Sequence, residues 1–439
     1  MTPSDRNTPH RPGAAARRAG RLAPLALACA LLVPGCTPAA RPPAWAGVRE
    51  ITPPELADVA AFDPGLAVGP RGRLALTWVT RDSAGAGVWL AVAPDSAGRF
   101  GAPRRLDDPA GRVSSYSESR PVAAFGPSGQ LVVAWAAHRD SGGFADDIVS
   151  RASADGGATF GPPVFVNDDS GDPKSTYHGF LALDFSPDGR ALAAWLDGRG
   201  AKLAPGEEEP ARAQVRLAAS LDEGHSWQPS VLVAAEGCPC CRLAMRADSA
   251  GRVVIAYRGA HDDLRDPRLA ISRDGGATFA LDTLVSADRW LLPGCPSVGP
   301  ALSANRAGGG LYAWFTGAEH ESDEVRPGVY LATWRADVGR TGPRRMLADS
   351  LREASRPMLA GMGATTLAGV IARPLADTTA RVLAVRAVEA DGAQTPWLFL
   401  GAAVRSAALA GAGPRRAYAV WIERPAEQPR LRLARLDRR

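Results

Sequence analysis

Apolar residues along this chain are grouped in short strand-like runs that recur at a regular spacing. Six of these runs end in an aromatic residue, and a weaker seventh ends at Ile371. Successive ends lie 50 to 62 residues apart, without an intervening apolar pattern of helical period. The pattern therefore predicts repeated all-β units. The aromatic ends are Trp78, Trp135, Trp195, Tyr257, Trp314 and Trp421.

Each repeat has room for four short strands joined by turns rich in Gly, Pro, Asp and Ser. Its alternating apolar and small residues fit strands that are buried on both faces. Seven units of about 57 residues account for the chain from position 44 onward. We therefore predict one β-propeller domain over residues 44–439. Four-stranded blades are expected, with seven blades favoured and six as the alternative.

A second motif recurs at blade spacing. Its copies read SADGGATF from Ser153, SLDEGHSW from Ser220 and SRDGGATF from Ser272, with a degenerate APDSAGRF from Ala93. The motif is typical of a hairpin turn in which the Asp carboxylate accepts backbone N–H bonds and a glycine takes a positive φ. It resembles the Asp box (BNR repeat) of sialidase-like β-propellers. The box aspartates are accordingly expected to be structural: Asp155, Asp222 and Asp274.

The N-terminal segment has the features of an export signal. Five arginines precede an apolar run from Leu22 to Val33, which is too short to span a membrane. The run leads into Val33-Pro34-Gly35-Cys36, which resembles a bacterial lipobox and implies lipidation of Cys36. An ordinary cleavage site with an incidental cysteine is the alternative. We predict a lipoprotein signal peptide over residues 1–36 and a Pro/Ala-rich tether over 37–43, which would anchor an exported protein to the bacterial cell envelope.

Charge argues against a nucleic-acid partner. The formal net charge is +5, but most of it lies in the predicted signal peptide, so the mature chain carries about +1. The chain has only two lysines, Lys174 and Lys202. A nearly neutral mature chain gives no electrostatic case for nucleic acid, which leaves the membrane, a glycan or an envelope protein as expected partners.

Three arginines occupy matching positions before the first strand of blades two, four and six. They directly precede positions that lie fourteen residues before each repeat end and so align in register: Pro64, Pro121, Leu181, Leu243, Pro300, Pro357 and Ala407. Loops that precede the first strand and follow the second strand share one face, the expected channel mouth. Three guanidiniums there repel one another unless an anion or acidic side chains lie between them. The set resembles the arginine triad with which sialidases hold a sugar carboxylate, although the Arg-Ile-Pro motif is absent. Ion pairing with neighbouring blades is the alternative. The predicted ligand-binding residues at this mouth are Arg120, Arg242, Arg356, Arg258, His178 and Trp290.

A sialidase also needs a tyrosine nucleophile beside a glutamate. Tyr257 and Glu236 are the catalytic candidates, with Tyr177 and Glu118 as alternatives, and spacing does not select among them. No P-loop, Rossmann glycine pattern, HExxH or GxSxG motif is present in the sequence.

Four cysteines remain after the predicted cleavage, all close to the first strands of blades four and five. Cys238, Cys240 and Cys241 lie in EGCPCCR, and Cys295 follows in LLPGCPSVGP. Exported thiols favour disulfides, and a bridge from Cys240 or Cys241 to Cys295 would join the two blades. The alternative is a copper or zinc site in which His261 or His320 joins these thiolates. No other cofactor is expected.

Three functional hypotheses follow from these features. The favoured hypothesis is a lipid-anchored propeller that binds a glycan, peptide or partner protein at its channel mouth. The alternative is a glycoside hydrolase like the exo-α-sialidases, because one propeller fold carries both enzymes and binders. Metal binding at the cysteines is the third.

Overall fold

The computed structural model describes residues 45–439 apart from 109–110, 140–144, 173–176, 200–211, 306–307, 322–324, 378 and 425–427. The predicted signal peptide, the lipidation site Cys36 and the tether lie outside these residues, so their boundaries stay predictions. Within the described part of the chain, no helix has the length and apolar character that a membrane crossing requires.

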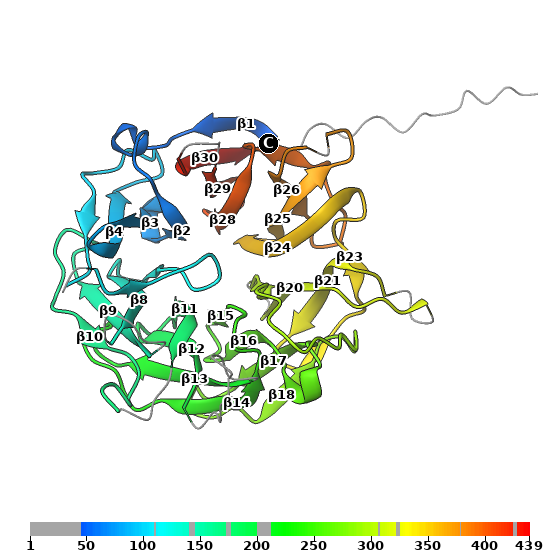
Figure 1. Ribbon diagram of the computed structural model, residues 1–439, viewed down its shortest axis with the longest axis horizontal. Helices are drawn as coiled ribbons and strands as arrows, with labels where there is room; N and C mark the ends of the chain where they lie inside the picture. Colours follow the sequence, from blue (N-terminus) through cyan, green and yellow to red (C-terminus); the bar gives the residue numbers. More distant parts are fainter. Residues whose placement is uncertain are drawn as a thin grey trace, which may run out of the picture. The chain divides into compact units, whose positions relative to one another are not determined.

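The described residues form seven antiparallel sheets arranged as a ring around a central axis (Figure 1). The predicted all-β propeller with seven blades is therefore confirmed. From the axis outward, blade 1 contains β2 (Phe62–Val68), β3 (Leu74–Asp82), β4 (Gly85–Ala93) and β5 (Arg104–Arg105). Blade 2 contains β7 (Val122–Phe125) with the short β6 (Val113–Ser114), then β8 (Leu131–His138), β9 (Asp146–Ser153) and β10 (Val164–Phe165). Blade 3 contains β11 (His178–Phe185), β12 (Ala191–Asp197), β13 (Ala213–Ser220) and β14 (Val231–Gly237).

Blades 4 to 6 repeat this order, with two short outer strands in blade 5. Single-turn 3-10 helices lie in connections between the described strands: η1 (Pro54–Leu56), η2 (Pro70–Gly72) and η3 (His261–Asp263). Blade 4 contains β15 (Ala244–Ala247), β16 (Val253–Arg258), β17 (Pro267–Ser272) and β18 (Leu281–Leu284). Blade 5 contains β19 (Ala301–Leu302), β20 (Gly309–Thr316), β21 (Gly328–Arg335), β22 (Arg340–Thr341) and β23 (Arg345–Met346). Blade 6 contains β24 (Leu351–Met362), β25 (Thr365–Pro374), β26 (Val382–Val388) and β27 (Leu398–Leu400).

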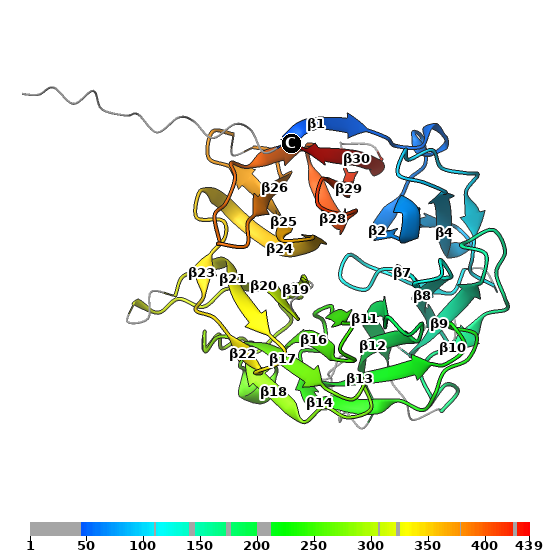
Figure 2. The ribbon, with the colours of Figure 1, turned by 180° about the vertical axis from the view of Figure 1, so that it is seen from behind.

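Blade 7 closes the ring by combining strands from both ends of the described chain. It contains β28 (Val404–Gly411), β29 (Arg416–Glu423) and β30 (Arg430–Arg438), and β1 (Trp45–Glu50) supplies the outer strand. β1 runs antiparallel to β30, as Figure 2 shows from behind. This pairing covers the outer edge of β30 and closes the ring, because strands from both ends of the described chain belong to the same blade.

The aromatic residues that end the sequence repeats pack between blades. Trp78 lies among Val420 and Ile422 of blade 7, and Trp195 lies against Val132 and Ile148 of blade 2. Each of these tryptophans is at most 1% exposed. Burial of a side chain this large stabilises each inter-blade contact by about 2–3 kcal/mol. The repeated aromatic position is thus the joint between neighbouring blades.

The three Ser-x-Asp-x-Gly turns have the same hydrogen bonds. In the turn after β9, the Asp155 carboxylate accepts the Thr159 N–H at 2.8 Å, and Ser153 Oγ accepts the Gly157 N–H at 2.7 Å. The equivalent carboxylates, Asp222 and Asp274, accept backbone N–H bonds at 2.8 and 2.9 Å. All three turns join the third and fourth strands of their blades, so these aspartates are committed to hairpin structure.

Candidate functional site

The first strands of all seven blades line a central channel cavity of about 200 Å³. Loops before the first strand and after the second strand share one face, because the Cys238 N–H before β15 donates to the Arg258 carbonyl at the end of β16. Arg120, Arg242 and Arg356 all lie at this mouth, each just before or within the first strand of its blade. The channel lining contains the positions aligned in register by the sequence repeats in five blades: Pro121, Leu181, Leu243, Pro300 and Pro357.

Glu118 lies between these arginines. Its carboxylate accepts hydrogen bonds from Arg242 at 2.6 Å, Arg356 at 2.9 Å and the Gly299 N–H at 2.8 Å. The Glu118 side chain is 1% exposed. The carboxylate thus belongs to blade 2 but is held by blades 4, 5 and 6. Arg242 and Arg356 therefore share the negative charge of Glu118 as an ion-pair partner within the chain.

Arg120 is held differently. Its Nη1 donates to the carbonyl oxygens of Pro64 at 3.2 Å and Ala407 at 2.7 Å, in blades 1 and 7. Burial, together with repulsion from Arg242, lowers the pKa of Arg120 to about 10. A second carboxylate, Asp63, lies nearby, and burial raises its pKa although Arg81 pairs with it at 2.8 Å.

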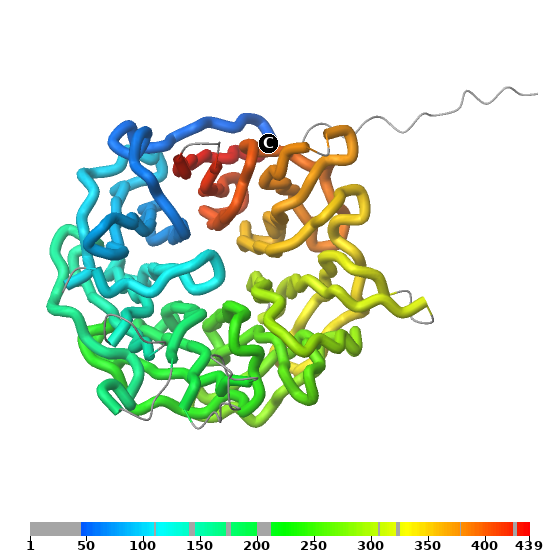
Figure 3. Tube along the Cα trace, viewed as in Figure 1, coloured from blue at the N-terminus to red at the C-terminus, as the bar shows by residue number. Residues whose placement is uncertain are grey.

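The loop that carries Glu118 lies at the channel mouth. It precedes β7 and reaches from blade 2 into the centre of the ring (Figure 3). Ser117 accepts a hydrogen bond from Arg356 at 2.8 Å, and Ser115 donates to Asp63 at 3.0 Å. The plug loop, residues 115–119, therefore contacts blades on both sides of the axis. The arginines at the mouth face this loop, which is the ion-paired alternative weighed from the sequence.

The catalytic candidates from the sequence have separate partners. The Tyr257 hydroxyl lies 2.9 Å from both carboxylate oxygens of Asp282, within blade 4. Burial and, to a smaller extent, the negative charge of Asp282 raise the pKa of Tyr257. Glu236 pairs with Arg212 at 2.5 Å and with His261 at 2.6 Å. The tyrosine and glutamate needed for a sialidase mechanism are therefore not placed together by these contacts.

The alternative pair also separates. The Tyr177 hydroxyl donates to the Pro239 carbonyl at 3.0 Å, whereas Glu118 faces the arginines. Tyr257, which is buried and has a raised pKa, is a poor nucleophile at neutral pH, because little of it is ionised.

Two predicted ligand residues, Arg258 and Trp290, form a packed unit. Arg258 is 2% exposed, and its guanidinium donates to the carbonyls of Val298, Arg265 and Phe315. Trp290 lies over it at 5.0 Å and packs edge-on against Phe315. These contacts fix Arg258 inside the protein rather than at the open face of the mouth.

His178 forms a buried charge cluster between blades 2 and 3. Its Nε2 lies 3.0 Å from Asp169 and 3.4 Å from Asp197, and its Nδ1 lies 2.7 Å from the Asp146 carbonyl. Burial opposes protonation, but the hydrogen bonds to the two carboxylates raise the pKa of His178 to about 9. Arg199 pairs with both aspartates. Three ligand atoms here are close enough for a metal ion, yet two protein cations already neutralise the carboxylates.

The cysteines contain a disulfide, as the sequence favoured. Cys240 is bonded to Cys295, which joins the segment before β15 in blade 4 to the segment before β19 in blade 5. Cys238 and Cys241 are buried thiols whose sulfur atoms lie 3.4 Å apart. Three of the sulfur atoms lie within 4.8 Å of one another, but that of Cys240 is used by the disulfide.

The histidines proposed as metal partners face other groups. His261 Nδ1 pairs with Glu236 at 2.6 Å, and His320 Nε2 lies 3.3 Å from the Arg289 carbonyl. The sulfur and imidazole ligands of the predicted copper or zinc site are therefore not assembled around one point by these contacts.

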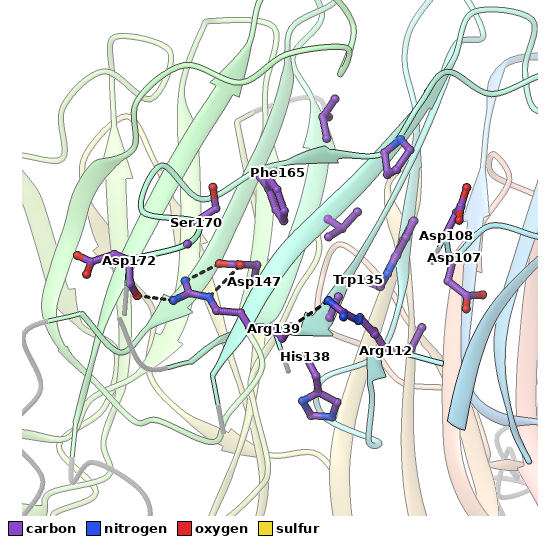
Figure 4. A pocket seen from close by; sticks show the side chains of 16 residues that line it. Asp107, Asp108, Arg112, Trp135, His138, Arg139, Asp147, Phe165, Ser170 and Asp172 are labelled. Carbon is purple, nitrogen blue, oxygen red and sulfur yellow. Dashed lines mark hydrogen bonds and ion pairs between the residues drawn. The ribbon is translucent and has the colours of Figure 1, made fainter. Parts of the chain in front are cut away.

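A groove in blade 2 lies near the mouth face, a feature that sequence reasoning missed. Its volume is about 650 Å³, and Figure 4 shows Phe165, Trp135 and Arg112 among its lining residues. Phe165 is 56% exposed, and Arg112 is also exposed. Asp147, in the same lining, is paired with Arg139 at 2.5 Å. We refer to this feature as the blade 2 groove.

Comparisons with known proteins give the fold only. No protein-family model matches the chain, and no curated protein matches it. By structure it is similar to the polysaccharide lyase Uly1, with a TM-score of 0.53 and 11% identity over 87% of this chain and 90% of the lyase. A PL25 ulvan lyase bound to -[GlcA(1-4)Rha3S]- gives 0.51 and 10% over 88% and 95%.

The sialidase neighbours are larger proteins. The Hadza microbial sialidase Hz136 gives a TM-score of 0.48 with 12% identity over 86% of this chain. This chain spans 66% of that sialidase, just under two thirds of its length. The likeness that this chain shares with the polysaccharide lyases is one of fold.

Proposed function

We propose that this chain is an Asp-box propeller lipoprotein of the bacterial cell envelope that binds an acidic glycan in the blade 2 groove without cleaving it. The three boxed turns and the propeller fold support the Asp-box family. The lyase neighbours act on polysaccharides, and one of them holds a glucuronate-containing saccharide, which supports a carbohydrate ligand by analogy of fold. The site itself must be argued from this chain.

The observation that carries the proposal is that the exposed Phe165 ring and Arg112 line the same groove, which is of suitable size. A volume of about 650 Å³ lies in the range of small-ligand sites, whereas the 200 Å³ channel does not. Aromatic rings pack on the apolar faces of sugars, and a guanidinium matches a carboxylate or sulfate. Among the described residues, no carboxylate forms an ion pair with Arg112, so its charge is available to a ligand.

The groove is a better ligand site than the channel mouth. At the mouth, the Glu118 carboxylate occupies the place that a sugar acid would take between Arg242 and Arg356. In the groove, Asp107 is already bonded to Arg105, which leaves the exposed Asp108 as the remaining acidic group at that end. An acidic ligand is therefore expected to direct its charge toward Arg112.

The experiment is a titration of the purified protein with acidic oligosaccharides, using glucuronate-, sulfate- and sialate-containing panels beside neutral ones. Binding is expected for acidic members, without release of fluorophore from a sialoside or of shortened chains from a polysaccharide. Turnover of any panel member would replace binding by catalysis as the function. Equal affinity for acidic and neutral members would remove the role given to Arg112.

A further inference from the structure

The four cysteines near the mouth are arranged for chemistry that neither glycan binding nor packing requires. A disulfide joins Cys240 to Cys295, and the free thiol of Cys238 lies 3.8 Å from the bonded sulfur of Cys240. Cys238, Cys240 and Cys241 are each at most 4% exposed, whereas Cys295 is exposed. A buried thiol therefore lies next to the inner sulfur of a disulfide whose outer sulfur faces solvent.

We propose that these cysteines form an internal thiol–disulfide exchange site in which Cys238 attacks Cys240 and releases Cys295 as an exposed thiol. The Cys238 thiolate gives an electron pair to Cys240 Sγ, and a Cys238–Cys240 S–S bond forms. The Cys240–Cys295 bond breaks, and its electron pair leaves on Cys295 Sγ, which takes up a proton from solvent. Cys238 has released one proton, so the numbers of thiols and disulfides stay constant and no oxidant is needed.

The surroundings favour Cys238 as the attacking sulfur. The hydrogen bond with Cys241, opposed by burial and aided by the positive charge of Arg258, lowers the pKa of Cys238 to about 7. Burial and the neighbouring Cys238 raise the pKa of Cys241. Arg258 is bound to carbonyl oxygens, and among the described residues no carboxylate forms an ion pair with it. An attacking thiol with a pKa close to ambient pH is the most effective one in such exchange.

The exchange has a structural consequence. The Cys240–Cys295 bond links the segment before blade 4 to the segment before blade 5, whereas a Cys238–Cys240 bond lies within one segment. Exchange thus unlinks the two blades at the mouth and leaves the Cys295 thiolate able to attack an external disulfide. A low-molecular-weight disulfide or an oxidised protein of the envelope is the class of partner with which it would form a mixed disulfide.

The test is alkylation of the native, purified protein by iodoacetamide without reductant, followed by peptide mapping. Labelling is expected at Cys295, together with a Cys238–Cys240 bond in the labelled molecules, and its rate should rise with pH around a midpoint near 7. Cys238→Ser, which removes the attacking sulfur, should slow this labelling about tenfold or more.

Three results would overturn the proposal. The first is equal labelling of Cys295 in Cys238→Ser and in the parent protein. The second is no labelling of Cys295 in a parent protein that yields two thiols when unfolded. The third is four thiols in the unfolded protein together with bound zinc or copper, which would make the cluster a metal site. The pH profile of the parent needs no variant, so a Cys238→Ser protein that fails to fold does not prevent the test.

Discussion

Glu118 of blade 2 and Arg242 of blade 4 are joined across the channel mouth by a 2.6 Å ion pair, although 124 residues separate them in the chain. Glu118 also bonds Arg356 of blade 6, so a single carboxylate pairs with guanidiniums from two other blades. Arg242 and Arg356, two of the three arginines read from the sequence as a ligand triad, thus form an internal ionic hub with Glu118.

Replacing Glu118 by Gln is expected to destabilise the fold by about 3 kcal/mol. The substitution keeps the shape of the side chain but leaves buried guanidiniums without their counter-charge, and removing one partner of a buried pair has a cost of this size. Urea unfolding measures the effect. Glu55→Gln, at an exposed position, is the control and should change stability by less than about 0.5 kcal/mol. Equal stabilities of the two variants would contradict a structural role for the hub.

Replacing Phe165 by Ala is expected to weaken binding of an acidic glycan about tenfold, which is about 1.4 kcal/mol, with little change in stability. The ring is largely exposed, so its loss removes ligand contact rather than core packing. Phe399→Ala, a phenylalanine of blade 6 that is 46% exposed, is the matched control. Calorimetric titration of both variants with the glycan measures the effect. A similar loss of affinity in both variants would show that the glycan does not bind specifically in the blade 2 groove.

Stability should fall as pH rises from about 6.5 to about 9. Hydrogen bonds with Asp169 and Asp197, which outweigh burial, raise the pKa of His178 from 6.5 to about 9. Protonated His178 therefore stabilises the folded state fully below pH 6.5, and this contribution is lost as pH passes through 9. Its size is at most about 3 kcal/mol.

Urea unfolding at pH 6, 7.5 and 9 measures this loss. His178→Gln should flatten the profile, whereas His225→Gln, at an exposed site, should leave it unchanged. A parent profile that stays level between pH 6 and 9 would show that His178 is not protonated in the folded protein.

Replacing Cys36 by Ala is expected to move the protein from the membrane fraction to the soluble fraction of the cell envelope. The prediction follows from the lipobox-like sequence, because the cysteine would carry the lipid. Fractionation followed by mass measurement of the N-terminal peptide tests it, with Thr37→Ala as control. A Cys36→Ala protein that stays in the membrane fraction would contradict anchoring through a lipid on Cys36. A parent N-terminal peptide without the added lipid mass would contradict it as well.

The blade repeats were predictable because they are local. Each strand of the repeat carries its own apolar pattern, and the same burial of an aromatic residue recurs in six of the seven blades, as with Trp78 and Trp195. Counting back from these residues was enough to place the first strands in register. The sequence also indicated a disulfide to Cys295, because both cysteine segments precede first strands of adjacent blades.

The site was predictable only in part, because its contacts are not periodic. Nothing local distinguishes Glu118 from other acidic loop residues, and its partners lie in three other blades. Phe165 was missed because alternation of apolar and polar residues marks strands but does not say which aromatic side chain remains exposed. Two cues were available: an acid two residues before Arg120, and an aromatic residue in the short outer strand of blade 2.

The hub also bears on the order in which the chain folds. The bonds of Glu118 to Arg242, Gly299 and Arg356 span 124, 181 and 238 residues. Closing such large loops costs entropy before any of these bonds can form, so local hairpins assemble first and the hub forms only when blades 2, 4, 5 and 6 are already side by side. The burial of Glu118 therefore marks the late stage of folding at which separate blades become one ring.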